Sequence, residues 1–235
     1  MRKIALLLLS SAIASPALAI DASVKDAPVA FDVNFIYHVD AGVAEQDVYI
    51  ERETGSGEVW RPGPKDNLPN APLFASAEPQ RHMPGNPEAD GPYPQGADLK
   101  LTLREWLGAS GNGQYRCENG QGHLTIDFEG LVPDGVYTLW HFFMVNGATD
   151  PFIGTYDLPA GAYDGSQSIF TADASGAAVY DQTYETCLQL SGEQLSAGLA
   201  VNWHSDGKTY GVEPGEFGLN AHIQLFAELP TRAGL

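Results

Sequence analysis

Histidines are the residues of this chain whose type and spacing could do chemistry. Three of the six, His141, His204 and His222, fall in apolar or alternating segments of the carboxyl-terminal half. The alternation places His204 and His222 on the polar faces of their strands, and neighbouring strands would bring two or three imidazoles together. Because imidazole is a preferred ligand of Cu and Zn, the sequence predicts a metal site here. His82 and Met83 would be accessory ligands, the thioether favouring Cu(I).

Two other interpretations of these histidines stay open. A histidine on a polar strand face is often only solvated or hydrogen-bonded. Met144 could supply a thioether near His141, but the two residues lie on opposite pleats of the strand and cannot both point at one ion. One histidine could instead be the acid or base of an active site without metal. The sequence contains no G-x-S-x-G, H-E-x-x-H or C-x-x-C motif and no glycine-rich phosphate loop. A serine, histidine and acid joined from distant positions is still possible, because geometry rather than order defines such triads.

The first nineteen residues have the three parts of a secretory signal peptide. Arg2 and Lys3 precede an apolar run, and Ala17-Leu18-Ala19 has the small-x-small pattern of a cleavage site. Serines and a proline interrupt the run well short of the roughly 20 apolar residues that a membrane span needs. We therefore expect a signal peptide at residues 1–19, a mature domain at 20–235 with no stable membrane span, and a periplasmic or secreted location.

Cys117 and Cys187 are the two cysteines of the chain. Since an exported protein enters an oxidising compartment, they are expected to form one disulfide bond. A thiolate nucleophile or a thiolate metal ligand would need the reducing environment that export excludes.

The charge balance is strongly acidic and restricts the possible partners. The formal net charge is −18 at pH 7, and removal of Arg2 and Lys3 with the signal peptide makes it more negative. Nucleic acid is excluded as a partner, because its binding depends on Lys and Arg that neutralise phosphates. The acidic surface favours solubility and leaves a small ligand or a metal ion as candidate partners.

The fold class follows from many short segments with a period of two, separated by turns rich in Gly, Asp and Pro. The segment 136–145 is apolar on both faces, which is typical of a central strand. One helical turn fits at 103–107, and no segment has a sustained helical period. These patterns predict an all-β protein, an antiparallel β-sandwich or jelly roll. Strands are expected at 29–38, 48–53, 58–61, 99–104, 124–129, 136–145, 168–171, 177–180, 199–204 and 221–229.

Residues 62–97 differ from the rest because they carry nine of the 16 prolines. Proline removes a backbone donor, so we expect no regular strand or helix in this stretch. The sequence predicts a long ordered loop that lies over the domain, with a flexible linker as the alternative.

Two segments carry resemblances to known groups of proteins. The run 130–140, with Asp206-Gly207-Lys208-Thr209-Tyr210-Gly211, resembles a loosely defined group of uncharacterised exported bacterial proteins over about residues 97–229. The segment Val201-Asn202-Trp203-His204-Ser205 is similar to a strand of CHRD domains, and the strands around Pro133 resemble the sandwich of copper–zinc superoxide dismutases. These resemblances imply a shape. The dismutase H-x-H ligand pair is replaced by the lone His141, so that activity is not implied.

Three functions are compatible with these observations. The first is an exported acidic β-sandwich that binds a metal ion, Cu or Zn, or a small ligand through polar-face histidines. The second is an extracellular hydrolase or lyase that acts on a polymer with a histidine as acid or base. The third is a structural envelope protein without a small-molecule site.

Overall fold

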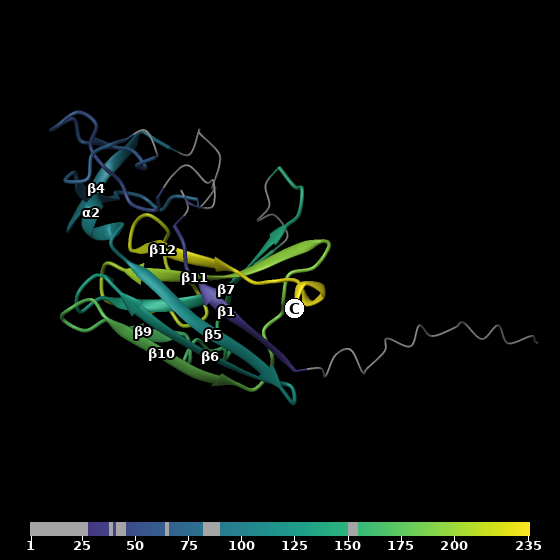
Figure 1. Cartoon of the computed structure of the whole chain (residues 1–235). Coiled ribbons are helices and arrows are strands. Elements are labelled where there is room, and N and C mark those ends of the chain that lie inside the picture. Colours follow the sequence, from purple (N-terminus) through teal and green to yellow (C-terminus); the bar gives the residue numbers. More distant parts are fainter. Residues whose placement is uncertain (1–27, 38–39, 41–45, 64–65, 82–89, 150–154) are drawn as a thin grey trace, which may run out of the picture.

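The computed structural model describes residues 28–37, 40, 46–63, 66–81, 90–149 and 155–235. The expected signal peptide, residues 1–19, and the accessory ligands His82 and Met83 lie outside these residues. Nearly all regular structure is antiparallel strand, arranged as two packed sheets with a third small sheet at one end (Figure 1). The predicted all-β sandwich is therefore confirmed. No helix among the described residues has the length and apolarity needed to cross a membrane.

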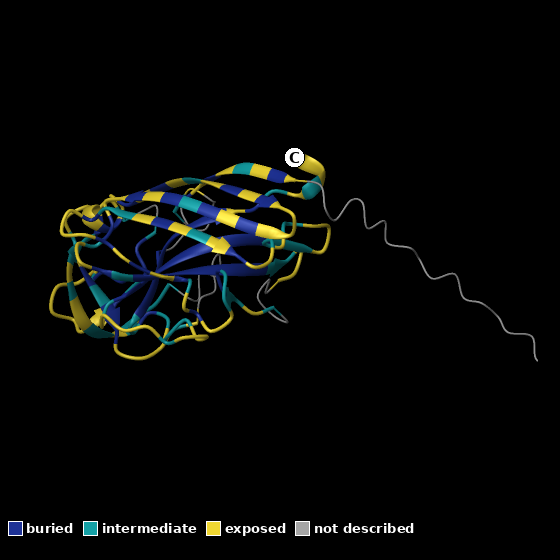
Figure 2. Ribbon diagram, turned by 90° about the horizontal axis from the view of Figure 1, so that it is seen from below, coloured by how far each residue is buried: buried dark blue, intermediate teal, exposed yellow. Residues whose placement is uncertain are grey.

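The first layer of the sandwich is a four-stranded sheet in which every neighbouring pair is antiparallel. Exposed and buried residues alternate along its strands, as Figure 2 shows, because one face is solvated and the other packs on the second layer. Its strands in spatial order are β1 (Val29–Asn34), β5 (Ser110–Glu118), β6 (Gln121–Glu129) and β10 (Ala178–Tyr184).

The second layer is a five-stranded sheet that is buried on both faces. The central strand β7 (Val136–Val145) has the bounds predicted from its continuous apolar run. Strands β7 and β11 are buried over most of their length, which differs from the half-exposed strands of the first layer. The spatial order is β12 (Ala221–Glu228), β11 (Leu195–His204), β7 and β8 (Leu158–Pro159), with β9 (Ile169–Thr171) also paired to β7.

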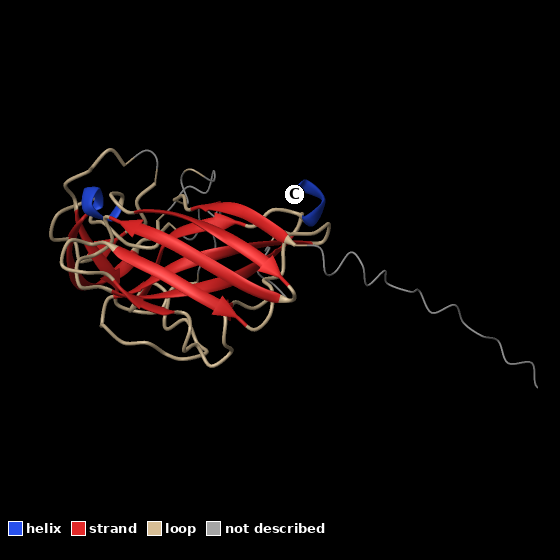
Figure 3. Ribbon diagram, turned by 60° about the horizontal axis from the view of Figure 1, so that its bottom comes forward, coloured by secondary structure: helices blue, strands red, loops and turns tan. Residues whose placement is uncertain are grey.

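The core lies between the two sheets, which stack face to face in Figure 3. A run of aromatic rings crosses it. Phe170 stacks on Phe128 with ring centroids 5.0 Å apart and on Tyr137 at 5.4 Å, and it meets Tyr180 edge-on at 5.7 Å. These rings belong to β6, β7, β9 and β10, so they join both layers through large buried apolar surfaces.

The proline-rich segment contains regular structure, so the prediction of no strand within residues 62–97 is wrong. A three-stranded sheet, with order β2-β4-β3, includes part of it, and a capped helical turn follows. The prolines are tolerated because Pro72 is the first residue of the edge strand β3 and Pro94 is the second residue of β4, so both lie where a strand begins. The elements are β2 (Glu58–Val59), β3 (Pro72–Ser76), β4 (Tyr93–Thr102), α2 (Leu103–Trp106) and, at the end of the chain, η2 (Arg232–Gly234).

A buried polar network joins the three-stranded sheet region to the sandwich. The indole of Trp106 in α2 donates to the side chain of Gln46 at 3.2 Å, and its backbone carbonyl accepts from Gln224 at 3.0 Å. The Gln224 amide oxygen in turn accepts from the Tyr137 hydroxyl at 3.0 Å. These bonds satisfy polar groups that would otherwise be buried without partners, and they fix the position of the segment around Gln46.

Candidate functional site

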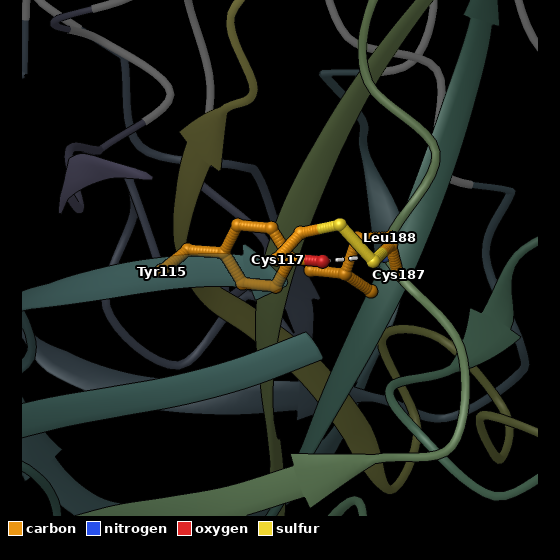
Figure 4. The surroundings of a disulfide bond; sticks show 4 residues. All are labelled: Tyr115, Cys117, Cys187 and Leu188. Carbon is orange, nitrogen blue, oxygen red and sulfur yellow. Dashed lines mark hydrogen bonds between the residues drawn. A yellow bond between two sulfur atoms is a disulfide. The ribbon is translucent and has the colours of Figure 1, made fainter. Parts of the chain in front are cut away.

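The disulfide bond predicted between Cys117 and Cys187 is present, and it holds one wall of a pocket. It attaches the segment after β10 to β5, with Cα atoms 5.5 Å apart. Next to it, the backbone N–H of Leu188 donates to the Tyr115 hydroxyl at 2.7 Å (Figure 4). Two tethers on adjacent residues therefore fix the path of segment 186–189 against the four-stranded sheet.

His141 supplies a third tether from the opposite sheet. It lies on β7 with its ring centroid 4.5 Å from that of Phe143, and its Nε2 is 3.0 Å from the backbone oxygen of Gln189. Since a carbonyl only accepts, Nε2 carries the proton and Nδ1 is left as an acceptor. Burial lowers the His141 pKa to about 4, more than its hydrogen bond raises it, so the ring is neutral near pH 7.

These tethers enclose a pocket of about 200 Å³ between β8 at the edge of one sheet and the segment after β10 at the edge of the other. The lining combines apolar and aromatic side chains with polar groups, and more of its accessible surface is polar than apolar. Tyr163, which is 74% exposed, forms part of it. Gly161 and Tyr184 also line the pocket. Gly161 has φ +89°, and a Cβ at this position would lie 2.7 Å from the Tyr184 ring. The remaining lining residues are His141, Phe143, Leu158, Pro159, Thr186, Cys187, Leu188 and Gln189.

His222 lies elsewhere and has different partners. Its ring is fully buried 5.4 Å from the Trp203 ring, so the expectation that His222 points away from the apolar side is wrong. Nδ1 is 3.0 Å from the backbone oxygen of Asp47, and Nε2 is 3.1 Å from the Ser205 hydroxyl. Burial is the main cause that lowers the His222 pKa. A bulge between β11 and β12 at Val201 shifts the pleat and turns this part of β12 inward.

The Asp47 side chain is held by a buried ion pair. One carboxylate oxygen is 2.6 Å from the Arg61 guanidinium, and the other accepts from the Ile223 backbone N–H at 3.0 Å. The two side chains are 0% and 2% exposed. Arg61 also donates to the Gln46 carbonyl at 3.2 Å and lies over the Tyr49 ring at 5.1 Å. The carbonyl that receives His222 is therefore rigidly placed.

His204 is on the other face of β11, with Asn202 as predicted, but that face is covered rather than solvated. His204 is 1% exposed, and its Nε2 is 2.8 Å from the Thr138 hydroxyl, which accepts from the Trp140 indole at 2.7 Å. Its Nδ1 is buried and has no hydrogen-bond partner within the part of the chain that the structure describes. Burial lowers the His204 pKa to about 4, despite the opposing charge of Asp206.

The structure does not bring the three histidines together as expected. His141 is opposite Leu199 and His222 is opposite Trp203, four residues further along β11, which is about 13 Å. His204 contacts Thr138 on the outer face, whereas His222 packs inward. No group of three or more His, Cys, Asp or Glu side chains among the described residues is arranged to hold a metal ion. Metal binding by individual histidines stays a prediction.

A second hollow, of about 370 Å³, lies on the outer face of the four-stranded sheet. Most of its lining side chains are of polar types, and they include His123, whose Nε2 is 2.7 Å from the Asp181 carboxylate on β10. Both side chains are about half exposed or more, so this ion pair is solvated and contributes little to stability. The other lining residues are Gly113, Gln114, Arg116, Thr125 and Asp127.

Sequence reasoning missed the partners of the histidines. Asp47 and Arg61 belong to no motif, and Ser205 was named as a member of the segment similar to a strand of CHRD domains, without a role of its own. The spacing between Asp47 and His222 is 175 residues, so no local pattern could connect them. The one usable signal for the pocket was the exposed aromatic residue in the turn at 161–165, since an aromatic in a Gly-rich turn does not contribute to a core.

Comparisons with known proteins give no match: no protein-family model, curated protein or solved structure is similar to this chain. The resemblances to CHRD domains and to copper–zinc superoxide dismutases therefore stay predictions, and the function is argued from geometry.

Proposed function

We propose that this protein is an exported binding protein whose pocket at His141 takes a small, uncharged organic molecule with hydroxyl groups, such as a sugar ring. The observation that carries the proposal is a neutral imidazole acceptor in a preformed pocket beside an exposed tyrosine ring. Small-molecule sites are usually concave and largely preformed, with polar groups placed to fix the orientation of the ligand.

The hydrogen-bonding capacity of His141 sets the chemistry of the ligand. Because Nε2 donates its hydrogen to the Gln189 carbonyl, Nδ1 can only accept a hydrogen bond, and a hydroxyl group of a ligand can donate one. Tyr163 offers an aromatic face to the apolar side of a ring. The acidic net charge of −18 disfavours anionic ligands such as sugar acids.

The size and rigidity of the pocket fit a ligand of one ring. Its volume of about 200 Å³ lies below the roughly 300–1,000 Å³ of pockets for drug-sized ligands. Segment 186–189 is held by the disulfide, by Tyr115 and by His141, so little ordering is required when a ligand binds. A preformed site of this kind loses less entropy on binding.

The test is the melting temperature of the whole protein with neutral monosaccharides, with hexuronates and with Cu²⁺ or Zn²⁺ alone, each at millimolar concentration. We expect neutral sugars to raise the melting temperature and hexuronates to have a smaller effect. Tyr163→Ala and His141→Phe should abolish the shift. Tyr156→Ala is the matched control, because Tyr156 is equally exposed at 74% and does not line the pocket.

Two outcomes would contradict the proposal. The first is the absence of a shift with any neutral sugar. The second is a shift that Tyr156→Ala reduces as much as Tyr163→Ala, which would indicate weak association with any exposed ring. A shift with metal alone that is lost in His141→Phe would replace the sugar ligand by an ion.

A further inference from the structure

The hydroxyl of Ser205 has the hydrogen-bonding environment of an activated nucleophile. It lies 3.1 Å from His222 Nε2, on the turn directly after β11. His222 Nδ1 is 3.0 Å from the Asp47 carbonyl, and a carbonyl can only accept. The proton is therefore on Nδ1, Nε2 is a bare acceptor, and the Ser205 hydroxyl donates to it. This is the direction of hydrogen bonding that a general base requires.

The base is oriented by groups that cannot move freely. The His222 ring packs against Trp203, and the carbonyl that receives Nδ1 belongs to Asp47, whose carboxylate is bound by Arg61 and by the Ile223 N–H. A base oriented by a third group is the general pattern of Ser–His active sites, and the pattern is defined by roles rather than by residue order. Here a backbone carbonyl takes the orienting role.

The electrostatics of this place suit a proton acceptor. Burial, the largest cause, lowers the His222 pKa, so the ring is neutral and able to accept near pH 7. The carboxylates of Asp47 and Asp206 both act in the opposite direction and stabilise an imidazolium that forms transiently, while the charge of Arg61 disfavours it.

The serine can be reached from solvent although its base cannot. Ser205 is partly exposed, and the next residues of the turn, Asp206, Gly207 and Lys208, are exposed, whereas His222 has no exposed surface. This arrangement protects the imidazole from water, while the serine residue itself is partly exposed.

We propose that Ser205 is a nucleophile, with His222 as its general base, toward small activated carboxylic esters. The Ser205 oxygen forms a bond to the acyl carbon, and its proton moves to His222 Nε2. The bond from the acyl carbon to the leaving alkoxide breaks, and the alkoxide takes the proton from Nε2. Water then attacks the acyl-serine by the same path, with His222 again accepting and returning a proton.

The probe for this site is a fluorophosphonate applied to the whole protein. The Ser205 oxygen would displace fluoride from phosphorus, with its proton passing to His222. Mass spectrometry should find one label on the peptide that contains Ser205, and hydrolysis of 4-nitrophenyl acetate should be lost with labelling. Ser205→Ala should remove both. His222→Gln should reduce the labelling rate about 100-fold or more.

Ser175→Ala is the matched control and should label like the parent protein. Ser175 also lies in an exposed turn, but its hydroxyl donates to the Asp173 carboxylate at 2.6 Å and has no imidazole partner. Folding of each variant is checked by its far-ultraviolet circular dichroism. An unlabelled parent protein, labelling at other serines, or labelling that His222→Gln leaves unchanged in a folded variant overturns the proposal. None of these results depends on the pocket at His141.

Discussion

The buried ion pair between Asp47 and Arg61 permits a prediction of stability from the structure. Replacing Arg61 by Met keeps most of the side-chain volume and leaves the Asp47 carboxylate buried at 0% exposure without its cation. Removing one partner of a buried pair costs about 3–5 kcal/mol, because the remaining charge is uncompensated. The lost bond to the Gln46 carbonyl and the lost contact with the Tyr49 ring act in the same direction.

The assay is equilibrium unfolding in urea, read by tryptophan fluorescence and extrapolated linearly to water. Adding Asp47→Asn to Arg61→Met should recover on the order of 1 kcal/mol or more, because the amide oxygen still accepts from Ile223 and carries no charge. A double variant at least as unstable as Arg61→Met would show that the uncompensated charge is not the cause.

Arg52→Met is the matched control for this prediction. Arg52 also pairs with an aspartate, Asp66 at 3.0 Å, and also lies over an aromatic ring, that of Trp60 at 5.6 Å. Its side chain is 42% exposed, so solvent screens the pair and its loss should cost less than about 1 kcal/mol. Equal losses in Arg52→Met and Arg61→Met would refute the argument from burial.

Three further predictions concern packing, the disulfide and pH. Gly113→Ala should cost about 3 kcal/mol or more, because its Cβ would lie 2.0 Å from the Thr125 backbone oxygen, whereas Gly192→Ala meets nothing within 4 Å and should be neutral in urea unfolding. Reduction of the disulfide, which spans 70 residues, should lower the unfolding free energy by about 4 kcal/mol, and an unchanged urea midpoint would contradict this. Burial lowers the pKa of His141 from its ordinary value of 6.5 to about 4 in the folded protein, so the unfolding free energy should decrease as pH falls through that window, by up to about 3 kcal/mol. Asp157, with its pKa raised to about 6, acts in the opposite direction, so the comparison is between the parent protein and His141→Phe, whose stability should fall less on acidification.

The strands that the sequence predicted well are those with a clear period of two or a continuous apolar run. The apolar run 136–145 and the alternation at 124–129 correspond to β7 and β6. Strand β5 was not predicted, because Gly111 and Gly113 interrupt its pattern. Both glycines are required by packing: a Cβ at Gly111 would lie 2.6 Å from the Phe128 ring, and one at Gly113 would meet the neighbouring strand. The two glycines in β5 therefore indicate a close approach of neighbouring groups to the backbone, not a loop.

The prediction about polar faces failed for two reasons: the bulge at Val201 turns His222 inward, and the face that carries His204 is covered. Alternation shows that His204 and Asn202 share a face, and it is correct about that, but it does not show whether the face is solvated. In this sheet the outer face is covered by residues 205–220, where Asn202 donates to the Pro214 carbonyl at 2.8 Å and the His204 ring lies 5.8 Å from that of Tyr210. A buried polar side chain must find a partner or lose free energy.

That requirement explains why the three candidate histidines, His141, His204 and His222, are separated rather than clustered. Each is buried, so each needs its own acceptor or donor near it, and the protein provides three different ones: a carbonyl for His141, a hydroxyl for His204, and a carbonyl with a hydroxyl for His222. The same requirement fixes one tautomer at His141 and at His222, because a carbonyl accepts at one nitrogen of each ring. The other nitrogen is then left as an acceptor, which at His222 meets the Ser205 hydroxyl, and the His141 ring lines a pocket. The chemistry proposed at His141 and at His222 thus arises from the hydrogen bonds that these two buried rings make with backbone carbonyls.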